Sequence, residues 1–392
     1  MVKLSVRLGI GNVILLGLVS FLTDVSSEMM MAILPMFIVA LGGTALAVGL
    51  IGGLGDSVSS ILQVFSGYWS DKYGKRKPLV FLGYLVSALS KLFLPFSTIW
   101  QHVLILRPIE RIGKGVRTAP RDAIIADSST VEVRGKAFGI HRAMDTGGAI
   151  LGSVLAFILF WLLGMDFRFI LAVSALIAFS ALLPLHPVKD LKRGGVKGLT
   201  LNVSLKILPK KLKLFILVAT VFALGNFTYM FFILKAQEFL LKVYSGKITI
   251  AIPILLYVLF NIVYSLFSIP SGILSDKIGR WKVLMVGYLV FGLTCLGFAL
   301  LNSLASLITL FCLYGLAYAL VEGNQRAFTS DLAAGEFRGT ALGTFHTSVG
   351  LATLPSSLIA GFLWQYFGST ATFIYGFVLS ITAMVLLFYS KP

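Results

Sequence analysis

Long apolar runs recur along the whole chain, and short polar segments separate them. Each run approaches the roughly 20 residues that an α-helix needs to cross a bilayer. The runs are continuous, whereas the strands of a membrane β-barrel would alternate apolar and polar residues over short segments. The pattern therefore predicts an all-α polytopic membrane protein with twelve spans, near residues 9–40, 45–66, 78–97, 100–122, 136–162, 168–186, 214–240, 250–270, 283–301, 305–326, 339–363 and 371–388.

The composition supports this fold class. Only 12% of the 392 residues are charged and 57% are hydrophobic, whereas a soluble domain carries about 25% charged residues. The first apolar run has a basic start, as a signal peptide does, but no cleavage site with small residues follows it. Asp24 and Glu28 come next instead, so we expect a first span that is retained.

The net charge of +17 reflects membrane orientation rather than a nucleic-acid partner. If the N-terminus is cytoplasmic, nearly all loop lysines and arginines fall on the cytoplasmic side, and the external loops hold only Arg168, Lys242 and Lys247. This asymmetry is the positive-inside pattern. We therefore expect a multi-pass protein of the plasma (cytoplasmic) membrane with both termini in the cytoplasm and with no nucleic-acid partner.

A polar stretch between the second and third spans recurs later in the chain. The segment SGYWSDKYGKRKPLVF begins at Ser66, and SGILSDKIGRWKVLMV begins at Ser271. At nearly the same offset, EVRGKAFG from Glu132 matches EFRGTALG from Glu336. Two separated matches with almost one offset indicate that the chain consists of two copies of one half.

This repeat predicts three parts. They are an N-terminal six-helix bundle (1–186), a basic cytoplasmic linker loop (187–213) and a C-terminal six-helix bundle (214–392). Repeated halves are a common architecture of secondary transporters, whose substrate binds between the halves near the membrane midplane. We also expect a monomer in the lipid bilayer, with a small organic solute as its binding partner.

The repeated stretch follows the pattern Gly-x-x-x-Asp-x-x-Gly-Lys/Arg, and its residue types have a physical use. Gly67 and Asp71 lie one helical turn apart, so one face of the helix offers a close contact and an anionic end. Gly74 allows the chain to turn with a positive φ. The pattern and its position after spans 2 and 8 resemble the signature loop of the major facilitator superfamily, and this resemblance covers essentially the whole chain.

The resemblance implies a transporter that works by alternating access, with these loops as a conformational gate. It implies that Asp71 pairs with Arg117 or Arg121 of span 4 and meets the N-terminus of span 11. Asp276 would do the same in the second half, with Arg326 as its partner. The alternative is a loop that only anchors the topology. The expected gate residues are Gly67, Asp71, Gly74, Arg76, Arg117, Arg121, Gly272, Asp276, Gly279, Arg280 and Arg326.

Ionisable residues inside the spans are candidate functional groups, because a charge in the bilayer is costly unless it is paired or hydrated. Asp24 and Glu28 are spaced i,i+4 and lie on one face of span 1. Span 4 carries a stripe of cations with a 4-3-7 spacing, at Arg107, Arg111, Lys114 and Arg121. A buried carboxylate near such cations can exchange a proton for a substrate charge. A static ion pair that holds the bundle together is the alternative.

Spans 4 and 5 partly resemble the drug and metabolite:proton antiporter branch of the superfamily. In span 4 that branch carries Arg-x-x-Gln-Gly-x-Gly, and alignment on Arg107 places Glu110 on the Gln and Arg111 on the first Gly. In span 5, Gly148 and Gly152 match a glycine pattern, but Ser153 replaces its proline. The resemblance gives Arg107 a role in proton handling.

Further polar residues lie in spans 5, 7 and 10. His141, Arg142 and Asp145 lie in the inner half of span 5, where the histidine is either a proton relay or part of a static polar network. In the second half, aromatic and amide groups either line a cavity for an amphipathic organic ligand or pack between helices. These residues are Asn226, Tyr229, Tyr314, Tyr318 and Glu322.

No motif for an enzyme or an ATP-driven pump is found in the sequence. A phosphate-binding Gly-x-x-x-x-Gly-Lys-Ser/Thr loop and a His-Glu-x-x-His pair are both absent. Cys295 and Cys312 lie in apolar runs and form no metal-binding pattern, so we expect no metal and no cofactor. The leading hypothesis is proton-coupled export of a small organic solute, with the proton as coupling ion.

The alternative is proton-linked uptake (symport) or uniport of an organic anion. It rests on the four cations of span 4, Arg107, Arg111, Lys114 and Arg117, which outnumber the acidic residues near them.

Overall fold

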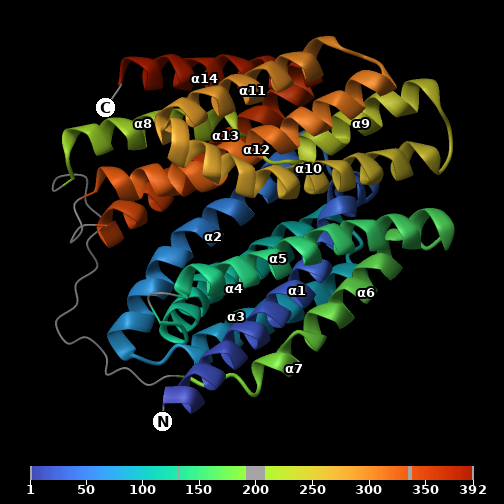
Figure 1. Cartoon of the computed structure of the whole chain (residues 1–392). Coiled ribbons are helices and arrows are strands. Elements are labelled where there is room, and N and C mark those ends of the chain that lie inside the picture. The colour runs from blue at the N-terminus through green and yellow to red at the C-terminus, as the bar shows by residue number, and fades with distance from the viewer. Residues whose placement is uncertain (1, 131–132, 191–207, 334–337, 391–392) are drawn as a thin grey trace. The chain divides into compact units, whose positions relative to one another are not determined.

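The computed structural model describes residues 2–130, 133–190, 208–333 and 338–390, and within these ranges every regular element is a helix. Before the central linker the helices are α1 (Val2–Ala40), α2 (Ala45–Tyr73), α3 (Lys77–Phe93), η1 (Leu94–Phe96), α4 (Trp100–Asp127), α5 (Arg134–Phe157), η2 (Ile158–Leu162), α6 (Phe167–Ser180) and α7 (Leu182–Leu185). After it come α8 (Lys210–Gly225), α9 (Met230–Val243), α10 (Ile248–Ile278), α11 (Arg280–Leu300), α12 (Leu304–Leu332), α13 (Arg338–Phe367) and α14 (Ser369–Tyr389) (Figure 1).

The predicted all-α membrane fold is confirmed. Among the described residues, eleven segments are long and apolar enough to cross a membrane, and each coincides with a predicted span. The remaining predicted span is α4, which has 28 residues and is also long enough to cross. Its many charged residues lower its hydropathy, so α4 is recognised as a span by its place in the fold rather than by its composition.

The seventh predicted span is broken into two helices. Helix α8 ends at Gly225, and α9 begins only at Met230. Side chains of other helices satisfy backbone groups within the break and just before it. The Thr228 N–H donates to Ser357 Oγ at 3.1 Å, and the Tyr375 hydroxyl donates to the Leu224 carbonyl at 2.6 Å. Non-helical backbone inside a membrane requires such partners, because no lipid group can replace them.

The contacts within the chain group its helices into two units. One unit comprises Met1–Leu34 and Val58–Leu201, and the other comprises Pro35–Ser57 and Asn202–Pro392. The end of α1 and the first part of α2 therefore pack with C-terminal helices. The division of α1 falls at Pro35, whose ring removes one hydrogen bond of the helix.

Glycines bring α2 close to its neighbours in the second unit. A Cβ atom at Gly52 would lie 2.6 Å from Thr228 Oγ1, and one at Gly53 would lie 2.9 Å from the Ser357 Cβ. From the other side, a Cβ at Gly361 of α13 would lie 2.7 Å from the Ala45 carbonyl oxygen. Small residues allow the backbones of membrane helices to approach one another in this way.

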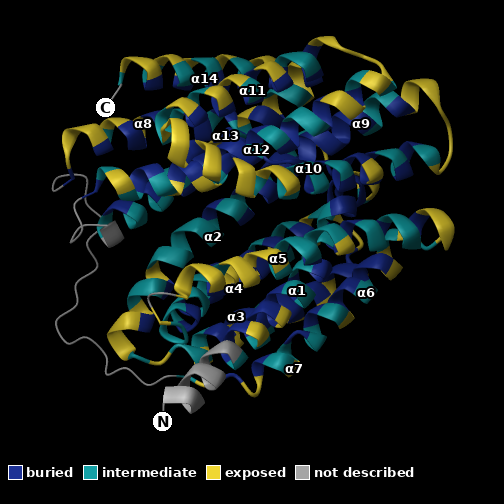
Figure 2. Cartoon of the chain, viewed as in Figure 1, coloured by how far each residue is buried: buried dark blue, intermediate teal, exposed yellow. Residues whose placement is uncertain are grey.

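Many exposed positions of the helices carry large apolar side chains. Figure 2 marks the exposed positions along α11 and α14. Large exposed side chains on these two helices include Val286, Leu289, Leu293, Ile374, Val378 and Val385. Apolar surface of this extent marks a contact with a membrane in a protein of this hydropathy.

Helices α3 and α4 meet through glycines, and this contact yields a prediction. A Cβ at Gly83 would lie 2.6 Å from the Gly113 carbonyl oxygen and 2.7 Å from the Arg117 Cβ. We expect Gly83→Ala to destabilise the protein by about 1–3 kcal/mol, because an atom forced into a packed contact must displace both helices. Melting temperature in detergent measures the effect. Gly139→Ala is the control, since nothing lies within 4 Å of a Cβ there; equal melting temperatures would contradict the prediction.

Candidate functional site

The first unit contains a buried ion pair within α4. Arg107 Nη1 lies 2.6 Å from Glu110 Oε2, and only 2% and 1% of the two side chains are exposed. The i,i+3 spacing places both groups on one helix face. Arg111 Nε lies 3.8 Å from the same Glu110 oxygen. One carboxylate therefore compensates two guanidinium groups inside the protein.

Lys91 of α3 is a functional candidate that the sequence analysis did not single out. Its side chain is buried, and its ammonium donates to Ser26 Oγ at 2.9 Å and to Ser27 Oγ at 2.8 Å. It also interacts electrostatically with Glu110. In the sequence, Lys91 is a lysine near the end of an apolar span. A lysine at such a position usually extends its side chain toward the membrane surface, so the sequence alone does not mark it as buried.

Two carboxyl groups meet between α1 and α5. The Asp24 and Asp145 carboxyl groups lie near each other and interact electrostatically. Ser20 Oγ donates to Asp145 Oδ1 at 2.6 Å, and Arg142 Nη1 lies 3.0 Å from Asp145 Oδ2. Two ionised carboxylates repel each other, and a proton on either group relieves that repulsion. We call Asp24 and Asp145 the acid pair.

Two further charged groups of α4 and α5 surround the acid pair. Lys114 is exposed and interacts electrostatically with Asp24. His141 is buried and lies near Asp145 and Arg121. Glu28, half-buried one turn from Asp24, also interacts with it electrostatically. Residues from spans 1, 4 and 5 that the sequence analysis named separately thus share one polar region.

Arg117 and Arg121 have partners within this unit. Arg117 Nη1 donates to Ser87 Oγ at 2.5 Å, and its guanidinium lies 4.5 Å from the centre of the Tyr84 ring. Arg121 Nη2 lies 2.9 Å from Asp122 Oδ1, and its Nη1 donates to Ser20 Oγ at 3.2 Å. Arg121 is therefore linked to the acid pair through Ser20.

In the second unit the predicted residues belong to an aromatic cluster. Tyr314 is buried, and its ring stacks on Phe232 at 4.0 Å and on Phe260 at 4.6 Å between centroids. The Tyr318 ring meets Tyr314 edge-on at 5.0 Å. The Tyr229 ring lies 5.4 Å from that of Tyr257. Tyr314 therefore has the surroundings of a packing residue.

Polar groups border this cluster at the helix break and on α12. The Tyr318 hydroxyl donates to Asn226 Oδ1 at 3.4 Å, next to the break between α8 and α9. Glu322 accepts a hydrogen bond from the Tyr264 hydroxyl, and Arg326 Nη2 lies 2.6 Å from the Glu322 carboxylate. Aromatic rings with polar groups at one edge suit an amphipathic organic molecule.

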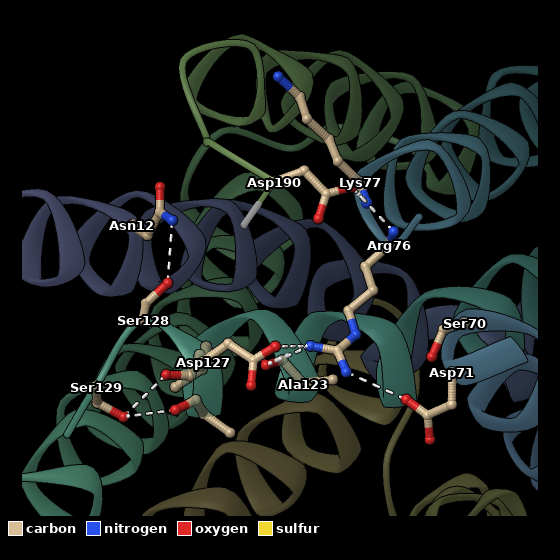
Figure 3. A network of polar contacts seen from close by, with 12 residues as sticks. Asn12, Ser70, Asp71, Arg76, Lys77, Ala123, Asp127, Ser128, Ser129 and Asp190 are labelled. Carbon is tan, nitrogen blue, oxygen red and sulfur yellow. Dashed lines mark hydrogen bonds and ion pairs between the residues drawn. The ribbon is translucent and has the colours of Figure 1, made fainter. Parts of the chain in front are cut away.

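The two copies of the repeated motif form the same three-residue cluster. Arg76 pairs with Asp127 and lies 3.2 Å from Asp71 (Figure 3). In the second copy, Arg280 lies 2.5 Å from Asp331 and 3.3 Å from Asp276. Both motif glycines turn the chain with a positive φ, 64° at Gly74 and 98° at Gly279. The repeat therefore preserves a charge cluster and a turn.

The start of the central linker is attached to the first cluster. The backbone N–H groups of Arg76 and Lys77 both donate to Asp190 Oδ2 at 3.0 Å, as Figure 3 shows. Asn12 donates to the Lys189 carbonyl at 2.9 Å and accepts from the Lys189 N–H at 2.9 Å. Asp190 thus supplies a carboxylate at the N-terminus of α3, where the helix dipole favours negative charge.

Comparison with known proteins identifies the family. The sequence model of the Major Facilitator Superfamily matches residues 16–255 and 215–392, two overlapping matches that together cover nearly the whole chain. The chain belongs to this superfamily. Its members are transporters rather than enzymes, so the chain is a secondary transporter that moves a solute across a membrane.

Relatives of known sequence cover most of the chain. An uncharacterised MFS-type transporter of Methanocaldococcus jannaschii is 53% identical over 96% of this chain and 94% of its own length. The multidrug resistance protein MdtH of Escherichia coli is 24% identical over 84% of this chain and 80% of its own length.

Solved structures of the superfamily share the fold. The nucleoside transporter NupG matches with a TM-score of 0.77 at 16% identity, over 97% of this chain and 98% of that one. The peptide transporter POT also matches with a TM-score of 0.77, at 14% identity over 96% and 93%. At these identities the likeness shows the fold alone.

The partners expected from the superfamily motif differ from those observed. Arg76, the motif's own arginine, is the residue next to Asp71, whereas Arg117 and Arg121 lie against Ser87 and Asp122. In the second half, Asp276 pairs with Arg280 rather than with Arg326. The reason is the distance along the helix. The motif cluster meets α4 at Asp127, and Arg117 lies ten residues before Asp127, roughly 15 Å away along α4.

Some sequence predictions lie outside the described residues. These are Glu132 and Glu336 of the second repeated stretch and residues 191–207 of the linker.

The two motif clusters differ in burial, which predicts different costs for the same substitution. Only 10% of the Asp127 side chain is exposed, against 53% for Asp331. We expect Arg76→Ala to destabilise by about 1.5–3 kcal/mol, because it removes a charged hydrogen bond from a shielded carboxylate. Arg280→Ala should cost at most about 1 kcal/mol, as for an exposed ion pair. Parallel unfolding titrations measure both, and equal losses would contradict the role assigned to burial.

Proposed function

We propose that the chain is a proton-coupled transporter of a small organic solute and that Asp24 and Asp145 carry the proton. The observation that supports this is the proximity of the two carboxyl groups beside Ser20 and Arg142, where a proton on either group relieves their mutual repulsion. Because the two carboxyl groups lie so close together, nearby charges influence how readily this proton is released. Arg142 and Lys114, which interact with Asp145 and Asp24, supply such charge.

The other buried pair supports a structural role instead. Arg107 and Glu110 are both almost fully buried and are held on one helix face at 2.6 Å. A pair of this kind neutralises itself and offers little access to a proton from solution. We therefore assign proton exchange to the acid pair and structural support of α4 to the Arg107–Glu110 pair.

Export is the first candidate for the direction of coupling. The distant similarity to a multidrug resistance protein favours it, as do Arg107, Gly148 and Gly152, which match the antiporter branch. In an exporter of this kind, a proton moving inward displaces the outgoing solute. The aromatic cluster around Tyr318 would bind the organic part of the solute.

Uptake or uniport of an organic anion is the second candidate. It is favoured by the position of Arg111 and Lys114, which lie one turn apart on α4 and interact with each other electrostatically. Such a pair in a span offers positive charge to a solute of opposite sign. Symport and export predict opposite effects of acid on solute binding.

We further propose that the motif end of the helices is cytoplasmic and forms the inner gate. The basic loops support this orientation, and the duplicated clusters around Arg76 and Arg280 connect helix ends there. Within this proposal the N- and C-terminal bundles are the two moving parts.

Proton coupling can be tested in liposomes that contain a pH-sensitive dye. We expect a pool of small anionic, cationic and neutral organic solutes to cause a pH change with the wild-type protein, and Asp145→Asn to lose it. Lys242→Gln is the control, because Lys242 is an exposed residue at the end of α9. Solute movement without any pH change in the wild type would contradict proton coupling.

A further inference from the structure

We infer that the first residues of the central linker are part of the inner gate, and that Asp190 is a positioning residue for Arg76. Asp190 holds the backbone at the start of α3, and this places the Arg76 side chain for its pair with Asp127. The inference rests on the proposed gate and adds the linker to it. The segment that joins the two halves then also controls one of the two motif clusters.

The start of α3 takes its cap from the linker. Arg76 is the N-cap residue of α3, and its own side chain makes no capping hydrogen bond. The first N–H groups of a helix have no partner inside the helix and need one from elsewhere. Asp190 supplies it, since its Oδ2 accepts from the N–H groups of Arg76 and Lys77 at 3.0 Å each. Asp190 lies 114 residues after Arg76 in the chain, so a distant segment replaces a local cap.

Other helices hold the linker segment in place. The Asn12 side chain of α1 donates to the Lys189 carbonyl and accepts from the Lys189 N–H, both at 2.9 Å. The same side chain donates to Ser128 Oγ, at the end of α4, at 3.0 Å. Val188 is only 2% exposed and packs in a hydrophobic cluster with residues of α1, α3 and α4. A segment held by burial and by backbone hydrogen bonds opens less readily than a free loop, so Asp190 has a fixed position.

Arg76 connects this segment to two other helices. Its backbone N–H is bonded to Asp190, whereas its guanidinium pairs with Asp127 of α4 and lies 3.2 Å from Asp71 of α2 (Figure 3). The guanidinium also donates to the Ala123 carbonyl at 3.2 Å. A side chain keeps such a geometry only while its own backbone is held in place. Loss of the Asp190 contact should therefore weaken the pair between Arg76 and Asp127.

The second copy of the motif is built differently at this point. Arg280 lies beside two carboxylates, as Arg76 does. Helix α11 begins after Gly279, and among the described residues no carboxylate accepts from its first N–H groups. The Trp281 ring instead donates to the Leu387 carbonyl of α14 at 2.8 Å. The charge cluster thus belongs to the repeat, whereas the carboxylate anchor belongs to the place where the linker joins the first half.

The anchor gives the linker a way to act on the gate. In the proposed transporter the two bundles are the moving parts, and the linker joins them, so their movement displaces the linker. Displacement of Asp190 breaks both N–H bonds and releases the backbone of Arg76. The linker therefore supports the closed cluster while it is anchored and loosens the cluster when it is pulled away.

Hydrogen exchange measures the contact directly. The protein is placed in nanodiscs, and mass spectrometry follows exchange in the peptides that cover Arg76 and Lys77. We expect exchange there to be about fivefold faster or more in Asp190→Ala, since two hydrogen bonds to a charged group are lost. Asp190→Asn should stay near the wild type, because its amide oxygen still accepts hydrogen bonds. Asp166→Ala, which removes the cap of α6 instead, is the control. Unchanged exchange in Asp190→Ala would overturn the inference.

A double-mutant cycle tests whether Asp190 positions the guanidinium. We expect Arg76→Ala to lower the melting temperature less in the Asp190→Ala background than in the wild type, because the pair with Asp127 is already weakened there. Arg280→Ala, in the second cluster, should have the same effect in both backgrounds. Additive losses for Asp190→Ala and Arg76→Ala would overturn the positioning role.

The gate role has a separate readout, the distance between the two motif ends. Spin labels are attached to cysteines at the exposed residues Thr130 and Lys277, in a background where Cys295 and Cys312 are replaced by alanine. Double electron–electron resonance then gives the distribution of distances between the labels.

We expect Asp190→Ala and Arg76→Ala each to shift the population toward longer distances, and Asp190→Asn to keep the wild-type distribution. A shift in Arg76→Ala but not in Asp190→Ala would overturn the role of the linker. If neither variant shifts the distances although exchange at Arg76 is faster, the proposed inner gate is refuted and the anchor of Arg76 by Asp190 stands.

Discussion

Replacing Glu110 by alanine is expected to destabilise the protein by about 3–5 kcal/mol, since it leaves a buried charge without its partner. The carboxylate lies 2.6 Å from Arg107 and 3.8 Å from Arg111, and the Arg107 and Glu110 side chains are only 2% and 1% exposed. Both side chains are almost inaccessible to solvent, so water does not readily replace the carboxylate. The free energy of unfolding, measured by SDS titration in mixed micelles, gives the size of the loss.

Two controls separate this effect from a general loss of packing. The double variant Arg107→Met with Glu110→Met should be more stable than Glu110→Ala, because removing both charges leaves none uncompensated. Asp276→Ala should cost at most about 1 kcal/mol, because 67% of its side chain is exposed beside Arg280. Equal costs for Glu110→Ala and Asp276→Ala would show that the buried pair is not a structural support.

The second large effect is expected at Asp24, whose replacement by asparagine should reduce proton-coupled solute flux at least tenfold. Asparagine keeps the size and polarity of the side chain but cannot exchange a proton with Asp145 or with solution. Facilitated movement of the solute down its own gradient should survive, because this movement requires no exchange of a proton. Flux in liposomes, measured with and without an imposed pH gradient, separates the two quantities.

Asp166→Asn is a suitable control for Asp24→Asn. Asp166 caps the N-terminus of α6, where its carboxylate accepts from the Phe169 N–H at 2.8 Å, outside the acid pair. An asparagine at that position still accepts the same bond, so coupling should be unaltered. If Asp24→Asn retained wild-type acceleration by the pH gradient, the acid pair would not be the site of proton coupling.

The span pattern was predictable because the bilayer imposes it on each segment separately. A membrane helix must satisfy its own backbone and present apolar side chains, so its length and hydropathy appear in the sequence. Eleven segments show this signal directly. Helix α4, predicted as a span together with the others, does not show it, because its charged residues lower its hydropathy. The break at residues 226–229 was not predictable, since its stability depends on Ser357 and Tyr375 from distant helices.

The candidate site, too, was predictable from the sequence only in part. The sequence located the ionisable residues in spans 1, 4 and 5 and the positive-φ glycines of the motif. It did not predict which residues pair, because partners are chosen by side-chain reach across helices that are far apart in the chain. Asp71 therefore has Arg76 as its neighbour rather than an arginine of span 4, and Lys91 was overlooked although it lies within the same polar region.

By itself, the sequence determined that this protein crosses the membrane many times, that it repeats one half, and that its charges inside the spans concentrate in the first half. Hydropathy, the motif spacing and the depth of each charge are properties of single segments, so no tertiary information was needed. Only the tertiary structure decided that Asp24 lies near Asp145, that Glu110 forms an ion pair with Arg107, and that Lys114 interacts electrostatically with Asp24. Electrostatic interactions weaken with distance and strengthen with burial, so the helix packing sets the role of each charge.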